Sequence, residues 1–470
     1  MKIEIDKNPN FSSISRSFAK LKKLNINIYK LLNKDFLDQL NPNQFIYLIG
    51  ITAYEGKNFH LNFKFIQRYI SRINIKNINL LLNIEGQLYN YFLKRYETEE
   101  AYQIFCSFFE SLYKKNQNKT IVQNLKNQSN EILFFIHAPV FLAHTNPLLY
   151  MLKNRKNFSK NITITSLTED EVFTRTLTEL NVKFVLLKGK TLLEQLNFLV
   201  SMSNKYKKIV WQSVPLYLGY VSKSIDNVCL WSFKFHPKFK NVKINIGSFQ
   251  TYDKKIIFKG NIWKNIDVGF DIKNLNNETE LWENRKLKFG AFCREELIDT
   301  KDYWSVVKII LEIVENSIFF YCGRKNIHTN WLSMLKIPPK RVVFLGWLEK
   351  PYLKLKEMSF LLDGFKLGHG YIAYEAMAAN VPIVFPSNRR SYGTLETYIN
   401  KLSKHSEHKH LFENSKNYFL KFKNNKEAAE IALQLMTDEK TNSFYGKYNN
   451  KLISLYPKDN FEDFQKVIFD

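Results

Sequence analysis

Cysteine is scarce in this sequence, and no cysteine stands close to another. The 470 residues contain four, Cys106, Cys229, Cys293 and Cys322, and their spacing fits no metal-ligand motif. This pattern favours reduced core thiols in a cytoplasmic protein. Long apolar runs are missing as well: none reaches the length of a membrane span, and the amino terminus lacks the apolar core of a signal peptide. We therefore expect a protein that stays inside the cell, in the cytoplasm.

Acidic residues are few relative to basic ones. Asp and Glu number 44 against 69 Lys and Arg, which gives a formal net charge of +25. Such a balance favours anionic partners: nucleotide diphosphates, membrane surfaces or nucleic acid. The charge is spread along the chain without a dense Lys/Arg tract, so nucleic acid is not expected. Peripheral contact with the inner face of the membrane stays open, and so does the simpler explanation that an AT-rich genome favours lysine, asparagine and isoleucine codons.

The first part of the chain has a helical pattern. Between about Ser12 and Asn124, apolar residues recur at helical spacing and β-branched alternation is scarce. Residues 1–128 are therefore predicted to form an all-helical domain. Two interpretations stay open for it, a module that docks an acceptor and a scaffold that packs on the next domain.

The pattern then changes to strands that alternate with helices. The runs ILFFI (132–136), ITITSL, VKFVLLKG and KIVWQSV are short and apolar, and helical segments separate them. This alternation predicts parallel sheets. The expected fold class is α/β, with two facing Rossmann-like domains behind the helical domain. Their expected ranges are 129–253 and 287–470, the second with C-terminal helices, and the polar range 254–286 is expected to link them.

The most informative stretch is 341–386, which reads strand, helix, strand, glycine-containing loop, helix, strand. In its loop, Gly368 and Gly370 flank His369 directly before the helix expected over 372–379. Open backbone N–H groups and the positive end of a helix dipole would suit a diphosphate there. The alternative is that these glycines only make a turn.

The run GWLEKPYLKLKEMSFLLDGFKLGHGYIAYEAMAANVPIVF resembles the nucleotide-binding domain of GT-B glycosyltransferases, with Asn380 in place of the usual glycine of EAMAxGxPVV. Upstream, FGAFCREELID and SIFFYCGR resemble the first two strands of that domain. The resemblance implies a hexosyltransferase that uses a nucleotide sugar, with a UDP-sugar as the expected donor and Glu375 on its ribose hydroxyls. A weaker resemblance to bacterial cytoplasmic protein glycosyltransferases related to O-GlcNAc transferases favours a polypeptide or glycan acceptor.

Three histidines are candidates for the catalytic base. His137 and His144 follow the first strand, and His144 with Pro147 resembles the GHxxP-like context of inverting GT-B enzymes. An imidazole there could take the proton of the acceptor hydroxyl. The alternative is a histidine that caps a helix or packs in the core, because the sequence pattern would be the same. In WSFKFHPKF, Lys234 and His236 share one side of an extended strand. Lys234 would neutralise the leaving diphosphate, unless this is only the solvated face of an edge strand.

Arg294 matches the place where many GT-B enzymes hold the donor diphosphate, although Glu295 and Glu296 depart from the usual basic run. Leu367 stands eight positions before Glu375, where retaining enzymes have a second glutamate, and there is no convincing Asp-X-Asp motif. We therefore expect a metal-independent, inverting transfer without a cofactor. Two alternatives remain: a nucleotide-sugar epimerase on the same scaffold, and a non-catalytic protein that binds polyanions or a membrane surface.

Overall fold

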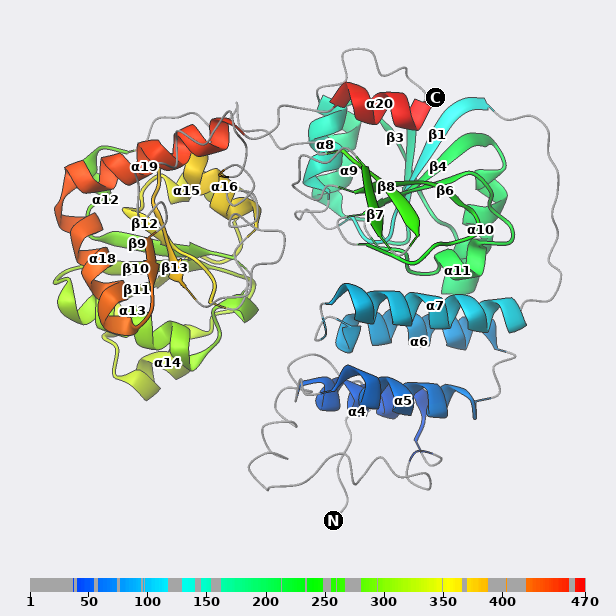
Figure 1. Ribbon diagram of the computed structural model, residues 1–470, viewed down its shortest axis with the longest axis horizontal. Helices are drawn as coiled ribbons and strands as arrows, with labels where there is room; N and C mark the ends of the chain where they lie inside the picture. Colours follow the sequence, from blue (N-terminus) through cyan, green and yellow to red (C-terminus); the bar gives the residue numbers. More distant parts are fainter. Residues whose placement is uncertain are drawn as a thin grey trace.

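The computed structural model places a helical layer and two parallel-dominated sheets along the chain (Figure 1). The structure describes residues 37, 40–54, 58–73, 77–93, 96, 98–116, 129–139, 145–153, 162–212, 214–232, 235–247, 255–258, 260–266, 280–293, 295–348, 350–365, 370–387, 403, 420–455 and 461–469. All statements about the structure concern these residues.

Within the described residues, the helical layer includes α4 (Pro42–Tyr54), α5 (Phe59–Ile70), α6 (Ile78–Tyr91) and α7 (Glu99–Asn116). Asn58 and Asn77 cap α5 and α6, because their side-chain oxygens accept the N–H groups of Leu61 and Leu80 at 3.0 and 3.1 Å. The apolar sides of these helices share one continuous core with the first sheet, including Trp211 of that sheet. The layer therefore packs on the next domain, and its role in docking an acceptor stays a prediction.

The first sheet has the strand order β3-β2-β1-β4-β5-β6-β8-β7, and every neighbouring pair is parallel except β7 with β8. Apolar clusters cover both faces, which explains why its central strands read as continuous apolar runs. The strands are β1 (Ser129–Ile136), β2 (Ile162–Ser166), β3 (Lys183–Leu186), β4 (Tyr206–Gln212), β5 (Val228–Ser232), β6 (Val242–Gly247), β7 (Lys255–Phe258) and β8 (Asn261–Asn265). The helices around it are α8 (Asn146–Lys153), α9 (Glu171–Glu179), α10 (Leu192–Ser203) and α11 (Leu218–Val221).

Strands β7 and β8 fall in the range 254–286, which the sequence analysis treats as a linker. They form a hairpin that adds to the first sheet through β6. This is a correction to the expected boundary at 253: described residues up to 265 belong to the first sheet. Along each strand of the hairpin, more exposed side chains alternate with more buried ones.

The second sheet is parallel throughout, with the order β11-β10-β9-β12-β13-β14. Clusters of buried side chains lie on both of its faces. Its strands are β9 (Lys288–Phe292), β10 (Ile318–Cys322), β11 (Val342–Phe344), β12 (Phe360–Leu362), β13 (Ile383–Pro386) and β14 (Leu420–Phe422). Its helices are α12 (Trp282–Arg285), α13 (Lys301–Ile313), α14 (His328–Leu335), α15 (Pro351–Leu355), α16 (Tyr371–Ala378), α18 (Asn425–Thr437) and α19 (Glu439–Ser454). The strand order reverses at β9 and β12, and ligands of such sheets bind at this switch point.

The last helix, α20 (Phe461–Phe469), packs on the first sheet, whereas α18 and α19 pack on the second (Figure 1, red and orange). The Phe464 ring centroid lies 4.7 Å from that of Trp231. The ammonium groups of Lys207 and Lys208 donate to carbonyl oxygens in the last turn of α20, at 2.7 and 3.2 Å. Cations suit the negative end of a helix dipole. The grouping of all C-terminal helices with the second domain is therefore wrong for α20.

Cys106, Cys229 and Cys322 are buried, as expected for core positions. Burial raises the pKa of the Cys229 and Cys322 thiols to about 12, so both stay protonated at neutral pH. No helix in the described part of the chain is long and apolar enough to cross a membrane.

Candidate functional site

The loop between β12 and α16 stands at the switch point of the second sheet. Asp363, which is fully buried, directly follows β12, and its carboxylate accepts the N–H of Gly364 at 2.9 Å. The Tyr303 hydroxyl fixes the same strand end by donating to the Leu362 carbonyl at 2.8 Å. Gly370 directly precedes α16, with φ 65° and ψ −126°, and a Cβ there would meet no described residue within 4 Å. The conformation requires glycine, and no described side chain crowds the start of α16.

Glu375 lies in the second turn of α16. Its Oε2 atom is buried and makes no hydrogen bond with any residue that the structure describes. Burial raises the pKa of this carboxyl to about 7. A buried acceptor without a donor is costly unless a ligand supplies one, so Glu375 is poised to accept a hydroxyl group.

Glu295 follows β9 and is only 8% exposed. Its Oε2 accepts the backbone N–H of Arg324 at 3.0 Å, and a Cβ at Gly323 would lie 2.9 Å from the same oxygen. The carboxylate thus fixes the loop that follows β10. This contact accounts for the acidic residue that departs from the basic run of the GT-B motif.

Arg324 and Trp347 form a site that the sequence analysis does not assign. They follow β10 and β11, and the Arg324 guanidinium lies 5.2 Å from the Trp347 ring centroid. Trp347 is 44% exposed although it stands beside a sheet edge. Gly346, at φ 71°, turns the chain there. An exposed aromatic ring beside a cation can stack on a planar ligand group. The Gly-Trp pair directly after a strand was the available sequence signal.

At the first sheet, His137 follows β1, and its ring centroid lies 5.6 Å from that of Tyr217. Tyr217 has a left-handed backbone, φ 63°, and its N–H donates to Glu85 Oε1 of α6 at 3.2 Å. The Tyr113 hydroxyl donates to the other oxygen of Glu85. Burial raises the pKa of Glu85 to about 7. The helical layer thus reaches the neighbourhood of a candidate base.

His236 follows β5 and is 1% exposed. Its Nε2 lies 2.8 Å from the Ser232 hydroxyl, and its ring centroid lies 5.4 Å from that of Tyr102 and 6.2 Å from that of Trp263. A general base must come within hydrogen-bond reach of its substrate. This enclosure does not favour His236 as the base.

No protein-family model matches the sequence, and no curated protein is significantly similar to it. Solved structures share its fold. HepE from Anabaena in complex with UDP and glucose matches with a TM-score of 0.51 at 13% identity, covering 72% of this chain and 98% of that chain. Its complex with UDP-glucose gives the same values. The chain has the GT-B glycosyltransferase fold. The expected fold class, two Rossmann-like domains behind a helical region, is confirmed.

An O-GlcNAc transferase from Thermobaculum terrenum matches over 97% of this chain and 94% of that chain, with 12% identity and a TM-score of 0.48. At these identities the similarity concerns the fold, and the chemistry must be argued from the residues.

Within this GT-B fold, Gly370 directly precedes α16 and Glu375 lies on it, whereas His137 and His236 follow strands of the other sheet. Five further predicted site residues lie outside the described residues: His144, Lys234, Arg294, Gly368 and His369. Their roles stay predictions. Within the described ranges, no three His, Cys, Asp or Glu side chains are grouped to hold a metal ion.

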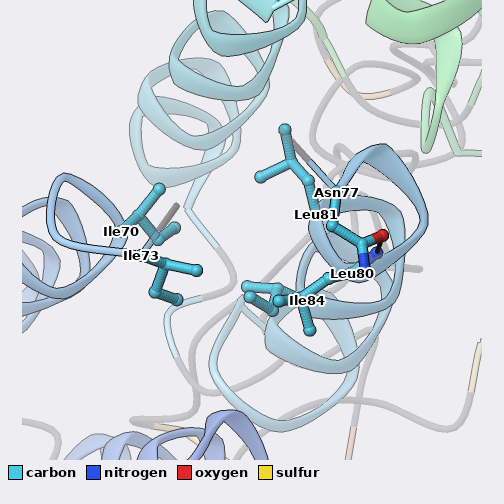
Figure 2. Close-up of a pocket in the computed structure, with 6 residues that line it drawn as sticks. All are labelled: Ile70, Ile73, Asn77, Leu80, Leu81 and Ile84. Carbon is cyan, nitrogen blue, oxygen red and sulfur yellow. Dashed lines mark hydrogen bonds between the residues drawn. The ribbon is translucent and has the colours of Figure 1, made fainter. Parts of the chain in front are cut away.

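A small apolar hollow lies in the helical layer, between α5 and α6 (Figure 2). It is lined by Ile70, Ile73, Asn77, Leu80, Leu81 and Ile84. Asn77, the single polar residue among them, already caps α6. The hollow has the wrong chemistry for a nucleotide, so it is not part of the candidate site.

Proposed function

We propose that this protein is a glycosyltransferase that moves a hexose from a nucleotide-diphosphate donor, a UDP-sugar, to a polypeptide or glycan acceptor. The transfer is metal-independent and inverting. The observation that carries the proposal is the buried Oε2 of Glu375, which has no hydrogen-bond donor among the described residues and lies on the helix that Gly370 precedes. The GT-B fold supports it, because the loop before this helix is where such sheets bind ligands.

The donor lies along the carboxyl edge of the second sheet in this proposal. Glu375 accepts hydrogen bonds from the ribose hydroxyls, and the start of α16 at Gly370 holds the diphosphate by its open N–H groups. Gly368, His369, Arg294 and Lys234 complete the diphosphate site as predicted from the sequence.

The base of the nucleotide stacks on the exposed surface of Trp347 and Arg324. Their 5.2 Å separation and the 44% exposure of Trp347 support this placement. Stacking tolerates any base, so it adds affinity without choosing the nucleotide.

In the reaction, an acceptor hydroxyl oxygen attacks the anomeric carbon from the face opposite the diphosphate. The new C–O bond forms as the bond to the diphosphate breaks, and the hydroxyl proton passes to the base, His144 or His137. The nucleoside diphosphate leaves with the electron pair of the broken bond, and cationic side chains and the helix end stabilise its charge.

The test is calorimetric titration of the full chain with UDP, GDP, ADP and the matching nucleotide sugars, with and without chelator. We expect one diphosphate to bind in both conditions. Glu375→Gln and Trp347→Ala should each weaken its binding about 5- to 150-fold, because a lost hydrogen bond or stacked ring is worth about 1–3 kcal/mol. The matched control Glu430→Gln, on α18, should bind as the wild type does. Binding of no nucleotide, or equal loss in the control, would overturn the proposal.

Product analysis then separates transfer from epimerisation. Incubation with the bound nucleotide sugar and a mixture of peptides and glycans should release the nucleoside diphosphate and join the sugar to an acceptor. Recovery of an isomeric nucleotide sugar would instead establish the epimerase alternative.

A further inference from the structure

The β7–β8 hairpin carries an exposed apolar pair. Ile257 is 70% exposed and Ile262 is 50% exposed, and the two are direct cross-strand partners. In Figure 1 the hairpin lies at the front of its sheet, and no helix is drawn across it. Exposed isoleucines scattered singly need no explanation, but a contiguous pair on an uncovered sheet face points to a contact.

Two lysines lie on the same face. Lys255 and Lys264 are exposed and directly opposite each other in the hairpin, two residues from the isoleucine pair. Neither forms an ion pair with a residue of the described part of the chain. Like charges directly opposite destabilise a hairpin. An anionic partner over this face would remove that repulsion.

The opposite face of the hairpin fixes its register. Phe258 stacks on Phe235 with ring centroids 4.6 Å apart, and Trp263 is fully buried. A shift by one residue would expose these aromatic rings. The isoleucine and lysine pairs are therefore held at the surface by the packing behind them.

Protection of a sheet edge explains only part of this pattern. A lysine on an edge strand prevents pairing between copies, and β7 is the edge strand. Lys264, however, lies on the interior strand β8, and exposed isoleucines would promote the aggregation that edge lysines prevent. A second copy of the chain, placed face to face by a two-fold axis, would bring four lysines together.

We propose that this face, Lys255, Ile257, Ile262 and Lys264, docks on an anionic lipid bilayer. The isoleucines enter the boundary between headgroups and acyl chains, and the lysines contact anionic headgroups. The net charge of +25 adds long-range attraction to the same surface. This inference goes beyond the proposed function and is independent of it, because neither the donor nor the acceptor enters the argument.

The test is sedimentation of the full chain with large vesicles of phosphatidylcholine, alone or with about 30% phosphatidylglycerol. Binding is expected only to the anionic vesicles and should weaken as salt rises. The double variants Ile257→Ser/Ile262→Ser and Lys255→Gln/Lys264→Gln should each lower the partition coefficient at least tenfold. The matched control Ile313→Ser/Lys340→Gln alters an isoleucine that is 42% exposed and an exposed lysine near the second sheet, and should bind as the wild type does.

Three results would overturn the proposal. One is that the isoleucine double variant binds anionic vesicles as strongly as the wild type does. Another is that the control variant loses as much vesicle binding as the isoleucine and lysine variants do. The third is a concentration-dependent dimer, seen by analytical ultracentrifugation, that the isoleucine variant abolishes without vesicle binding by the wild type. Thermal unfolding of each variant shows that it is folded. Ile257→Trp gives a second measurement, since its added fluorescence should shift to the blue only with anionic vesicles.

Discussion

At the scale of single residues, the carboxyl groups of Glu85 and Glu375 have burial-raised pKa values but differ in their hydrogen-bond partners. Glu85 accepts the Tyr113 hydroxyl and the Tyr217 N–H, whereas Glu375 has no donor for Oε2 within the described residues. Burial raises the pKa of both to about 7. The hydrogen bonds of Glu85 oppose part of that effect. A buried carboxyl group with hydrogen-bond donors for both oxygens, such as Glu85, joins two elements of the structure. A carboxyl oxygen without a donor among the described residues, such as Glu375 Oε2, is available to a ligand.

Glu375→Gln should therefore change the pH dependence of stability. The folded-state pKa is raised from 4.5 to about 7, so the folded protein keeps a proton that the unfolded chain loses, and the wild type loses stability as pH rises through this window. At about 1.4 kcal/mol per pH unit, the full effect is about 3 kcal/mol. Glutamine does not titrate. The free energy of unfolding of Glu375→Gln, relative to that of the wild type, should therefore increase by about 3 kcal/mol between pH 4 and pH 8. Urea unfolding at pH 4, 6 and 8 measures it, with Glu430→Gln as the control. A stability difference that does not vary with pH would contradict the assignment.

At the scale of elements, the helical layer and the first sheet meet at two glycines. Gly86 lies in the middle of α6, where glycine costs about 1 kcal/mol relative to alanine. A Cβ there would overlap the Tyr217 hydroxyl oxygen, while the ring carbon that bears it would stay at 3.4 Å. Gly219 of α11 likewise lies against the backbone of Glu110 in α7. A Cβ at Gly219 would be 2.9 Å from the Cα of Glu110. Close approach accounts for both glycines, and it holds the loop that carries Tyr217 beside His137.

A double-mutant cycle isolates this contact. Gly86→Ala should destabilise the protein by about 1–3 kcal/mol, because the overlap with the hydroxyl outweighs the better helix propensity. In the Tyr217→Phe background the same change should be neutral or stabilising by up to about 1 kcal/mol, because the clashing oxygen is gone. Denaturant unfolding of the four proteins gives the coupling energy. Equal effects of Gly86→Ala in both backgrounds would show that the contact does not form.

At the scale of the whole molecule, the chain returns to its first sheet at the end. The last helix α20 supplies Phe464 and Ile468 to the core of that sheet, and Lys207 and Lys208 bond its last carbonyls. The second sheet is therefore inserted between two parts of the chain that stabilise the first. Removal of α20 would therefore expose the core of a sheet that is distant in sequence. Lys208 and Val467, which form a hydrogen bond, are 259 positions apart.

Phe464→Ala should cost about 3–5 kcal/mol, as expected for deleting a buried aromatic side chain. Hydrogen exchange followed by mass spectrometry should show faster exchange in β1, β4 and β5, with β9 to β13 unchanged. Phe444→Ala, which removes a ring that is 62% exposed on α19, is the matched control and should leave both sheets as they are. Faster exchange in the second sheet, without a change in the first, would contradict the packing of α20 on the first sheet.

The sequence by itself determined the class of fold and the loop at which we propose that the donor binds. Short apolar runs between helical segments predict parallel strands buried on both faces, and the loop before α16 follows from strand and helix order alone. Glu375 was also predicted from its motif, but the sequence did not indicate that its Oε2 has no hydrogen-bond partner among the described residues. These features are local, because a residue pattern records which side of an element is buried.

Only the tertiary structure decided which partner each buried side meets. It joined β7 and β8 to the first sheet, carried α20 back across the chain, enclosed His236 and set Arg324 beside Trp347. An amphipathic strand or helix shows that it needs an apolar neighbour, but many surfaces of similar composition would serve. The choice among them rests on packing between segments far apart in sequence, which one chain read in order does not contain.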